Sequence, residues 1–325
     1  MVALVPLVLA TLLVGTASAA HVSCGQTITQ STTLDSDVGP CTGTGIRVGA
    51  NNITLDLGGR TVFARAPQTG EGAGILVEGR TGVTVRNGRV ILFDAGVVIQ
   101  GGSGNTVTNV VAQDNIGTRA TDFGDGIAVF GSSNNVIRRN RAQHNGPFSG
   151  ISLVGNSDNN LVDNNTVQGN DVESSPTLMD DIGIRVEGPG VNNNVVSNNK
   201  VEGNGLDGIQ VFFFAANSDN ITRRNTLRGN GFHNKAHRAG NGFVSGARLN
   251  LVEANLAERN AASGIRINGT NNTIRNNVAR NNAVPPLSPG TIAAGGAFDL
   301  HDTTFNCDNN VWTNNTGNRN QPCIG

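Results

Sequence analysis

The sequence has no tyrosine, one tryptophan and little charge. Charged residues make up 14% of the 325 residues, the formal net charge is −1, and lysine occurs only as Lys200 and Lys235. No long basic stretch is present, so neither a phosphate-neutralising surface nor a nucleic-acid partner is predicted. Apolar residues make up 37% of the chain, but they come in short pieces rather than in the rhythm of amphipathic helices.

Only the N-terminus carries a longer apolar run. This run extends from Val2 to Val14, is broken by Pro6, and is followed by Ala17-Ser18-Ala19, which matches a signal-peptide cleavage site. It is too short for a comfortable membrane span, and no second such segment follows. We therefore expect residues 1–19 to be a signal peptide. The mature chain should be secreted, extracellular or periplasmic, with no membrane span. One departure from a typical signal peptide is that no Lys or Arg precedes the run.

The cysteines form two close pairs at opposite ends of the chain, Cys24 with Cys41 and Cys307 with Cys323. An even number of cysteines in an exported chain predicts disulfides. Three connectivities are possible in principle. If the two ends of the chain lie at opposite ends of a rod, only the local pairs can close.

A repeat runs through most of the chain. Its first mark is a glycine followed by an apolar–variable–apolar triplet, the period-2 pattern of a strand with one buried face. The anchors are Gly45, Gly74, Gly96, Gly126, Gly150, Gly183, Gly208, Gly242, Gly264 and, with alanine in place of glycine, Ala297 before Phe298-Asp299-Leu300.

Asparagines mark the rest of each repeat. One opens a second apolar segment roughly nine residues after the glycine, and two more follow at intervals of five, as in Asn160, Asn165 and Asn170. Asparagine tolerates left-handed backbone angles and bonds its own turn. Stacked asparagines can also bond the coils above and below. Three short strands and three corners in about 22 residues make one turn of a β-helix. The sequence thus predicts an all-β, single-stranded, right-handed parallel β-helix of about ten coils.

These marks divide the chain into parts. We assign residues 20–44 to an N-terminal cap with a disulfide, residues 45–318 to the helix and residues 319–325 to a C-terminal cap segment, in a chain expected to be monomeric. The longer repeats carry their extra residues just before the Gly-apolar strand, near 61–73, 116–124, 171–182, 231–241 and 283–296. Insertions on one face of a solenoid often mark its binding face. The alternative is that this corner merely tolerates insertion.

The Gly-Ile-x-Val strands and the N-x-[VI]-x-x-N rows resemble the repeat of pectate-lyase-like parallel β-helices, especially the NosD-type and carbohydrate-binding sugar-hydrolase repeats. The resemblance covers nearly all of residues 45–318. It implies a polysaccharide partner more often than any other, on a scaffold that carries lyases, hydrolases, epimerases, adhesins and non-enzymes. NosD-type proteins are associated with copper. However, Met179 is the only methionine after the initiator, so few copper ligands are available.

Acidic residues before the strands are the candidates for catalysis. Asp125 lies in a segment that resembles the first motif of polygalacturonase-like enzymes. The pair Asp180 and Asp181 loosely resembles their second motif, one residue out of register. Asp207 stands where those enzymes carry histidine. Arg266-Ile267-Asn268 echoes their Arg-Ile-Lys motif without the lysine, so Arg266 is a candidate substrate-binding residue.

The carboxylates of Asp181 and Asp207 are expected on neighbouring coils, roughly 5 to 7 Å apart, as in glycosidase acid–base pairs or a calcium site. For a lyase, Arg185 is the candidate basic residue, and calcium is the candidate cofactor, although no cofactor is certain. The alternative is that the slot before the glycine needs only a small polar turn former, because Ser149, Asn241 and Ser263 also occupy it.

Aromatic residues supply a further clue. On the outward side of the strand row fall Phe130 and one or more of Phe212, Phe213 and Phe214, with Phe212 as the candidate. There they suit stacking against sugar rings, or else pack as a local core under a loop. His233 and His237 have i, i+4 spacing but no evident third zinc ligand. His301 is expected to point outward beside Asp299 and Asp302.

Two hypotheses follow. In the first, the protein is a secreted β-helix that binds or processes a polysaccharide along its strand face, as a polysaccharide lyase or glycoside hydrolase if it is an enzyme. In the second, it is a non-catalytic surface or structural β-helix used for adhesion or as a scaffold.

Overall fold

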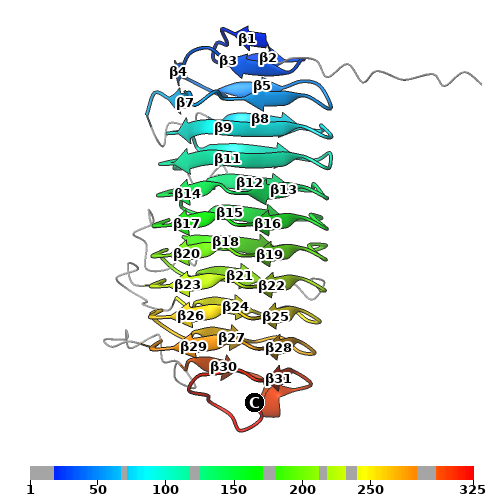
Figure 1. The fold of residues 1–325 in the computed structure, drawn as a ribbon, viewed down its shortest axis with the longest axis vertical. Coiled ribbons are helices and arrows are strands. Elements are labelled where there is room, and N and C mark those ends of the chain that lie inside the picture. The colour runs from blue at the N-terminus through cyan, green and yellow to red at the C-terminus, as the bar shows by residue number, and fades with distance from the viewer. Residues whose placement is uncertain are drawn as a thin grey trace, which may run out of the picture.

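The computed structural model describes residues 18–66, 72–117, 124–170, 181–211, 218–231, 240–283 and 298–325. In these residues the chain winds into a rod of stacked coils, with its N-terminal strands at one end and its C-terminal strands at the other (Figure 1). The prediction of a single-stranded, right-handed parallel β-helix is confirmed. No described helix is long and apolar enough to cross a membrane.

One sheet, here called the anchor sheet, takes one strand from each coil. Its 11 strands are parallel and follow chain order. They are β2 (Gln26–Ile28), β5 (Ile46–Val48), β8 (Ala73–Glu78), β10 (Ala95–Gln100), β12 (Ile127–Phe130), β15 (Ser149–Val154), β18 (Ile182–Glu187), β21 (Ile209–Val211), β24 (Phe243–Ser245), β27 (Ile265–Ile267) and β30 (Leu300–Asp302).

The remaining strands form a larger, 20-stranded sheet around the rest of each coil. They are β1 (Ser18–Ala20), β3 (Thr32–Leu34), β4 (Val38–Cys41), β6 (Thr54–Asp56), β7 (Thr61–Ala64), β9 (Thr84–Ile91), β11 (Thr106–Gln113), β13 (Val136–Arg138), β14 (Arg141–Gln143), β16 (Leu161–Asp163), β17 (Thr166–Gln168), β19 (Val195–Ser197), β20 (Lys200–Glu202), β22 (Ile221–Arg223), β23 (Thr226–Arg228), β25 (Leu251–Glu253), β26 (Leu256–Glu258), β28 (Thr273–Arg275), β29 (Val278–Arg280) and β31 (Val311–Thr313).

The predicted register is confirmed for nine anchors and wrong for the tenth. The apolar residues after Gly45 to Gly264 pair in sequence from Ile46 to Ile265. On the last strand, however, Leu300 pairs with Ile265, where the sequence pattern had placed Phe298. A slip of two residues leaves every side chain on the same face of the strand. Alternation alone therefore could not distinguish the two registers.

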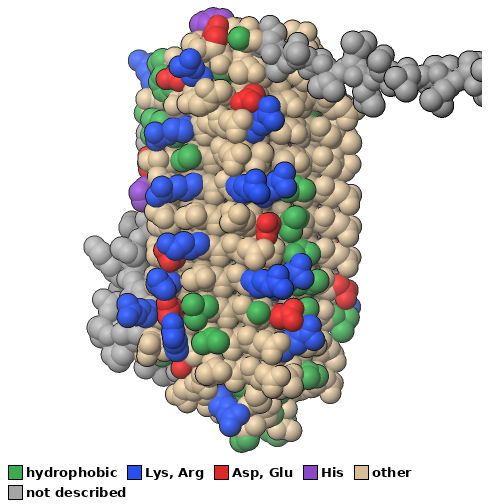
Figure 2. Space-filling view, in the orientation of Figure 1, with side chains coloured by type: hydrophobic (Ala, Val, Ile, Leu, Met, Phe, Trp, Pro, Cys, Tyr) green, Lys and Arg blue, Asp and Glu red, His purple; other side chains and the backbone are tan. Residues whose placement is uncertain are grey.

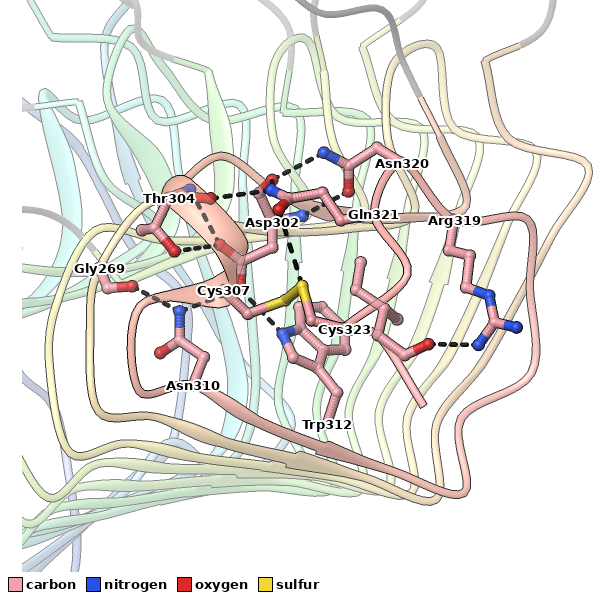
Figure 3. Close-up of a disulfide and its surroundings, with 11 residues drawn as sticks. Gly269, Asp302, Thr304, Cys307, Asn310, Trp312, Arg319, Asn320, Gln321 and Cys323 are labelled. Atoms are coloured by element: carbon pink, nitrogen blue, oxygen red, sulfur yellow. Dashed lines mark hydrogen bonds between the residues drawn. A yellow bond between two sulfur atoms is a disulfide. The ribbon is translucent and has the colours of Figure 1, made fainter.

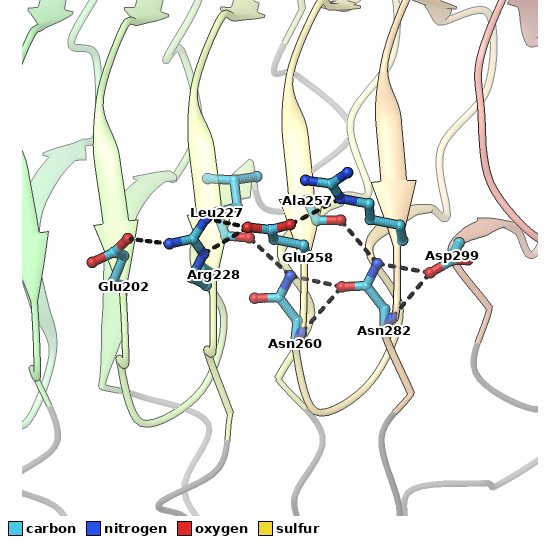
Figure 4. A network of polar contacts seen from close by, with 9 residues as sticks. Glu202, Leu227, Arg228, Ala257, Glu258, Asn260, Asn282 and Asp299 are labelled. Carbon is cyan, nitrogen blue, oxygen red and sulfur yellow. Dashed lines mark hydrogen bonds and ion pairs between the residues drawn. The ribbon is translucent and has the colours of Figure 1, made fainter.

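The asparagine rows are ladders. Asn165 is 2% exposed. Its side-chain oxygen accepts from the backbone and side-chain nitrogens of Asn140, at 2.9 and 3.1 Å, and its own amide donates to Asn199 and to the carbonyl of Ile137. The same pattern recurs at all three corners of the coils. One of the three ladders ends at Asn282, whose side-chain amide donates to the carboxylate of Asp299 at 2.8 Å (Figure 4). The buried corners are thereby satisfied without water.

Charged side chains follow the coils on the outer surface. Lys and Arg form two broken columns on one face of the rod, with Asp and Glu between them (Figure 2). On one row the charges alternate in sign: Glu202, Arg228, Glu258 and Arg280 lie on successive strands, and Arg280 is 2.9 Å from the Glu258 carboxylate (Figure 4).

Both local disulfides are confirmed, Cys24–Cys41 and Cys307–Cys323. Strands β2 and β3 of the N-terminal segment pair with β5 and β6, so this disulfide-bonded segment is itself a coil. Most of the signal-peptide assignment, and most residues of the five assigned insertions, lie outside the described ranges. The expected cleavage would remove Ser18 and Ala19 from strand β1.

Candidate functional site

The anchor sheet carries a row of side chains that point away from the core. The outward row consists of the residues that follow the anchor apolar positions: Arg47, Leu76, Val98, Ala128, Ser152, Arg185, Gln210, Val244, Arg266 and His301. Val98 and Ala128 belong to an apolar cluster separate from the main core. From Ser152 onward the row becomes mostly polar. Unlike the ladders, the outward row does not repeat one residue type.

A pocket opens near the point where the outward row changes from apolar to mostly polar side chains. It has a volume of about 190 Å³ and is lined by Asp125, Phe130, Phe148, Val154 and Arg185. Arg185 lies over the ring of Phe148, with its guanidinium carbon 5.6 Å from the ring centroid. The structure thus brings together Asp125, Phe130 and Arg185, which were all candidates from the sequence.

Two of the pocket's properties were not visible in the sequence. Phe148 escaped notice because it lies in a corner, outside the strand pattern. Arg185 also pairs with the carboxylate of Glu187, so its charge is partly balanced. The pocket combines two aromatic rings with acidic and basic groups.

A hydrogen-bonded array crosses four successive coils nearer the C-terminus. The Oδ1 atom of Asp207 accepts from the backbone N and Nδ2 of Asn241 at 2.7 and 3.0 Å. The Oδ1 atom of Asn241 accepts from the backbone N of Ser263 at 3.2 Å. The Oγ atom of Ser263 is 3.1 Å from Nδ1 of His301. These four residues, with Arg266 beside them on the outward row, are called the Asp207–His301 array.

Two groups of the array have shifted protonation equilibria. Burial raises the pKa of Asp207 to about 6, against the opposing effects of the Asn241 hydrogen bonds and the Arg266 charge. Burial and, to a smaller extent, the Arg266 charge lower the pKa of His301 to about 4, and the Asp302 charge opposes the shift. Near neutral pH, therefore, Asp207 is ionised and His301 is neutral.

The contact between Ser263 and His301 fits either tautomer of the imidazole. The Ser263 oxygen accepts from the backbone N of Phe298 at 3.3 Å and keeps a second lone pair and its own proton, so it can accept from or donate to Nδ1 of His301. The tautomer that donates from Nδ1 to Ser263 leaves the lone pair of Nε2 for proton transfer.

The other acidic candidates are spread along the rod. Asp125 and Asp207 both lie two residues before an anchor position, but Ser149 and Ile182 occupy the two intervening coils. Three coil steps separate them by roughly 14 Å. Asp181 accepts at its carbonyl from the backbone N of Leu206, so it lies opposite Leu206 rather than Asp207. Asp180 and Phe212 lie outside the described residues.

No metal cluster is evident in the described part of the chain. No group of three or more His, Cys, Asp or Glu side chains there could hold a metal ion. The position before the anchor glycine is not reserved for acidic residues. Asn241 and Ser263 also occupy it, and both belong to the array.

Solved structures with a similar fold include a pectate lyase, a DFA-IIIase and a tailspike protein. Pectate lyase Pel9A aligns at 15% identity with a TM-score of 0.62, over 94% of this chain and 79% of that one. DFA-IIIase from Arthrobacter chlorophenolicus A6, in complex with GF2, aligns at 15% identity with a TM-score of 0.54, over 86% and 70%. The Dettilon tailspike protein gp208 aligns at 17% identity with a TM-score of 0.50, over 78% of this chain and less than half, 46%, of the tailspike chain.

At these identities the likeness is one of fold. Among curated proteins, none matches the sequence. The family model described as "Right handed beta helix region" matches residues 18–187, 68–220 and 183–322, which together span most of the chain. The protein therefore belongs to the right-handed β-helix family.

Proposed function

We propose that the protein binds a polysaccharide along the outward row of the anchor sheet and processes it by acid–base chemistry at the Asp207–His301 array. The observation that carries the proposal is the array itself, which joins a neutral imidazole, an arginine and a carboxyl group with a raised pKa. Similarity in fold to a pectate lyase and a DFA-IIIase supports carbohydrate as the ligand class.

The pocket is the proposed place for one sugar ring. Aromatic rings such as Phe130 and Phe148 stack on the apolar face of a sugar, and charged groups at the rim fix its hydroxyls. Arg185 and Arg266 lie three coils apart on the same row, which is roughly 14 Å. A polymer lying along the rod axis would reach both.

The array favours elimination over hydrolysis. Glycoside hydrolases use two carboxyl groups that flank the scissile bond, whereas the array has Asp207 alone. Elimination begins with removal of a proton next to a sugar carboxylate. Neutral His301 would act as the base, Arg266 on the neighbouring strand would balance the carboxylate charge, and water would protonate the leaving oxygen. Asp207 lies three coil steps from His301, roughly 14 Å, so it would contact the polymer further along the rod. The proposed substrate is accordingly an acidic polysaccharide.

The proposed elimination does not depend on calcium, because Arg266 supplies the positive charge that balances the substrate carboxylate. Any calcium requirement would be seen in the screen with and without added calcium. The two disulfides support a location outside the cytoplasm, and we propose that the chain is secreted.

Purified protein should be screened against acidic and neutral polysaccharides, with and without added calcium, while the unsaturated sugars formed by elimination are followed by ultraviolet absorbance. We expect His301→Asn to lower turnover by about 100-fold or more, the usual scale for a general base. His144→Asn is the matched control, because His144 is exposed and pairs only with Asp114 on a distant corner. Full activity of His301→Asn would overturn the assignment. Failure to bind any glycan would favour the non-catalytic scaffold.

A further inference from the structure

The C-terminal end of the rod carries a hollow that the repeat does not explain. It has a volume of about 570 Å³ and is lined by Thr303, Thr304, Phe305, Asn306 and Gln321. None of these side chains is charged. The hollow begins at the residue after strand β30, so it lies where the outward row ends.

Phe305 is displayed to solvent. It is 95% exposed, against 55% for Val311, the next most exposed large apolar side chain of the described residues. A phenylalanine that capped the end of the core would be buried. Its exposure calls for an explanation other than capping.

The backbone after Phe305 turns through left-handed conformations. Asn306, Cys307, Asp308 and Asn309 have φ values of 49, 59, 28 and 62°. Asn and Asp adopt such angles more readily than most residues, and asparagines with positive φ also recur along the rod. The Cys307–Cys323 disulfide and the hydrogen bond from the Asp308 N to the Phe305 carbonyl, at 3.0 Å, fix the turn. The turn therefore presents the Phe305 ring from a fixed backbone.

The polar residues of the hollow are already oriented. Thr304 Oγ1 donates to Asp302 at 2.6 Å, and Thr303 Oγ1 donates to Asn268 at 2.9 Å. The amide nitrogen of Gln321 donates to the carbonyls of Asp302 and Thr304, at 2.7 and 2.8 Å (Figure 3). Since these bonds use the donor hydrogens, the hydroxyl and amide oxygens remain able to accept hydrogen bonds from a ligand.

An exposed aromatic ring beside fixed, uncharged acceptors matches the surface of a sugar. A pyranose or furanose ring presents an apolar C–H face to an aromatic side chain and hydroxyl donors at its edge. The absence of charged side chains from the lining favours a sugar without a carboxylate. We infer that the C-terminal hollow is a second carbohydrate site, which binds an uncharged sugar ring stacked on Phe305.

The chain contains its own reporter for this site. Trp312 is the only tryptophan, and its indole N–H donates to Asp302 at 2.8 Å. The other carboxylate oxygen of Asp302 accepts from the backbone N and hydroxyl of Thr304, a residue of the hollow (Figure 3). A ligand that contacts Thr304 should therefore change the Trp312 emission.

The test is a fluorescence titration of the whole protein with neutral gluco-, galacto-, manno- and fructo-oligosaccharides and with oligouronates. We expect a saturable change with at least one neutral sugar, and binding at least ten-fold weaker in Phe305→Ala. Val311→Ala removes an exposed apolar side chain that does not line the hollow, and should bind like the unaltered protein.

Two results would overturn the inference. One is no response to any neutral sugar, or equal affinity in Phe305→Ala. The other is self-association, seen by sedimentation, that Phe305→Ala abolishes while sugars have no effect; the hollow would then be a contact between copies of the chain. Neither result bears on the Asp207–His301 array, which is tested by turnover.

Discussion

At the scale of single residues, Asp207 makes stability depend on pH. Because its folded pKa is about 6 against an ordinary value of 3.8, the folded state binds more protons than the unfolded state between those values. Its ionisation therefore weakens the fold as pH rises through this window, by up to about 3 kcal/mol. We expect Asp207→Asn, which keeps the acceptor oxygen for Asn241, to raise the urea midpoint at pH 7 and change it little at pH 4. Equal midpoints for the two proteins at pH 7 would contradict a buried, ionised Asp207.

His301 acts with the opposite sign. Its folded pKa of about 4 lies below the ordinary histidine value of 6.5, so the unfolded state binds more protons in that window and stability is lost as pH falls through it. In the unaltered protein the opposite effects of Asp207 and His301 on the pH dependence of stability partly cancel. In His301→Asn the loss of stability at low pH caused by His301 should be absent. We therefore expect the free energy of unfolding of this variant to rise as pH falls from 7 to 5. Parallel pH profiles for the variant and the parent would show that His301 titrates normally.

The sequence pointed to Asp207 and Arg266 individually, but it did not reveal the hydrogen-bonded array that includes His301. Asp207 and Arg266 stood out because they flank anchor positions whose register is unambiguous. His301 was expected to point outward, but its contact with Ser263 depends on the pairing of Leu300 with Ile265. A two-residue slip preserves the alternation, so the sequence pattern could not reveal that contact. The burial that shifts both pKa values also arises only in the folded molecule.

At the scale of the elements, the ladders were predictable because they are local and periodic. Asparagines at intervals of five mark the corners between strands, and identical residues at equivalent corners must stack once the coils are in register. The hollow at the C-terminus was not predictable in this way. Residues 303–309 follow no repeat, and their positive φ values belong to Asn, Cys and Asp rather than to glycine.

Replacing one ladder residue should therefore be costly. Asn165→Leu would leave the backbone N of Asn140 and the carbonyl of Ile137 without partners in a buried corner. We expect a loss of at least about 2 kcal/mol in the free energy of unfolding, since each orphaned group costs roughly 1–3 kcal/mol. Arg141→Leu, at an exposed strand position near the same ladder, is the control and should change stability little. Chemical denaturation measures both, and an unchanged midpoint for Asn165→Leu would mean that the ladder does not stabilise the coils.

At the scale of the whole molecule, the rod is stabilised by contacts between neighbouring coils. Apart from the disulfides, each coil is bonded mainly to the coils on either side, as in other solenoids. The terminal coils have one neighbour only, and the disulfides Cys24–Cys41 and Cys307–Cys323 lie at those two ends. The chain thus places covalent links where the non-covalent contacts are fewest and where an open sheet edge would invite association.

Reducing both disulfides should therefore loosen the ends and leave the centre folded. We expect hydrogen exchange to accelerate in strands β1 to β4 and in residues 305–323, while strands β13 to β23 keep their protection, because their ladders do not include a cysteine. Trp312 lies inside the C-terminal loop and should report the same change by its emission. The Cys24→Ala/Cys41→Ala variant offers the matched comparison, since only the N-terminal strands should then lose protection. Uniform loss of protection along the rod would show that the coils unfold as one cooperative unit, and that nearest-neighbour stacking does not describe this protein.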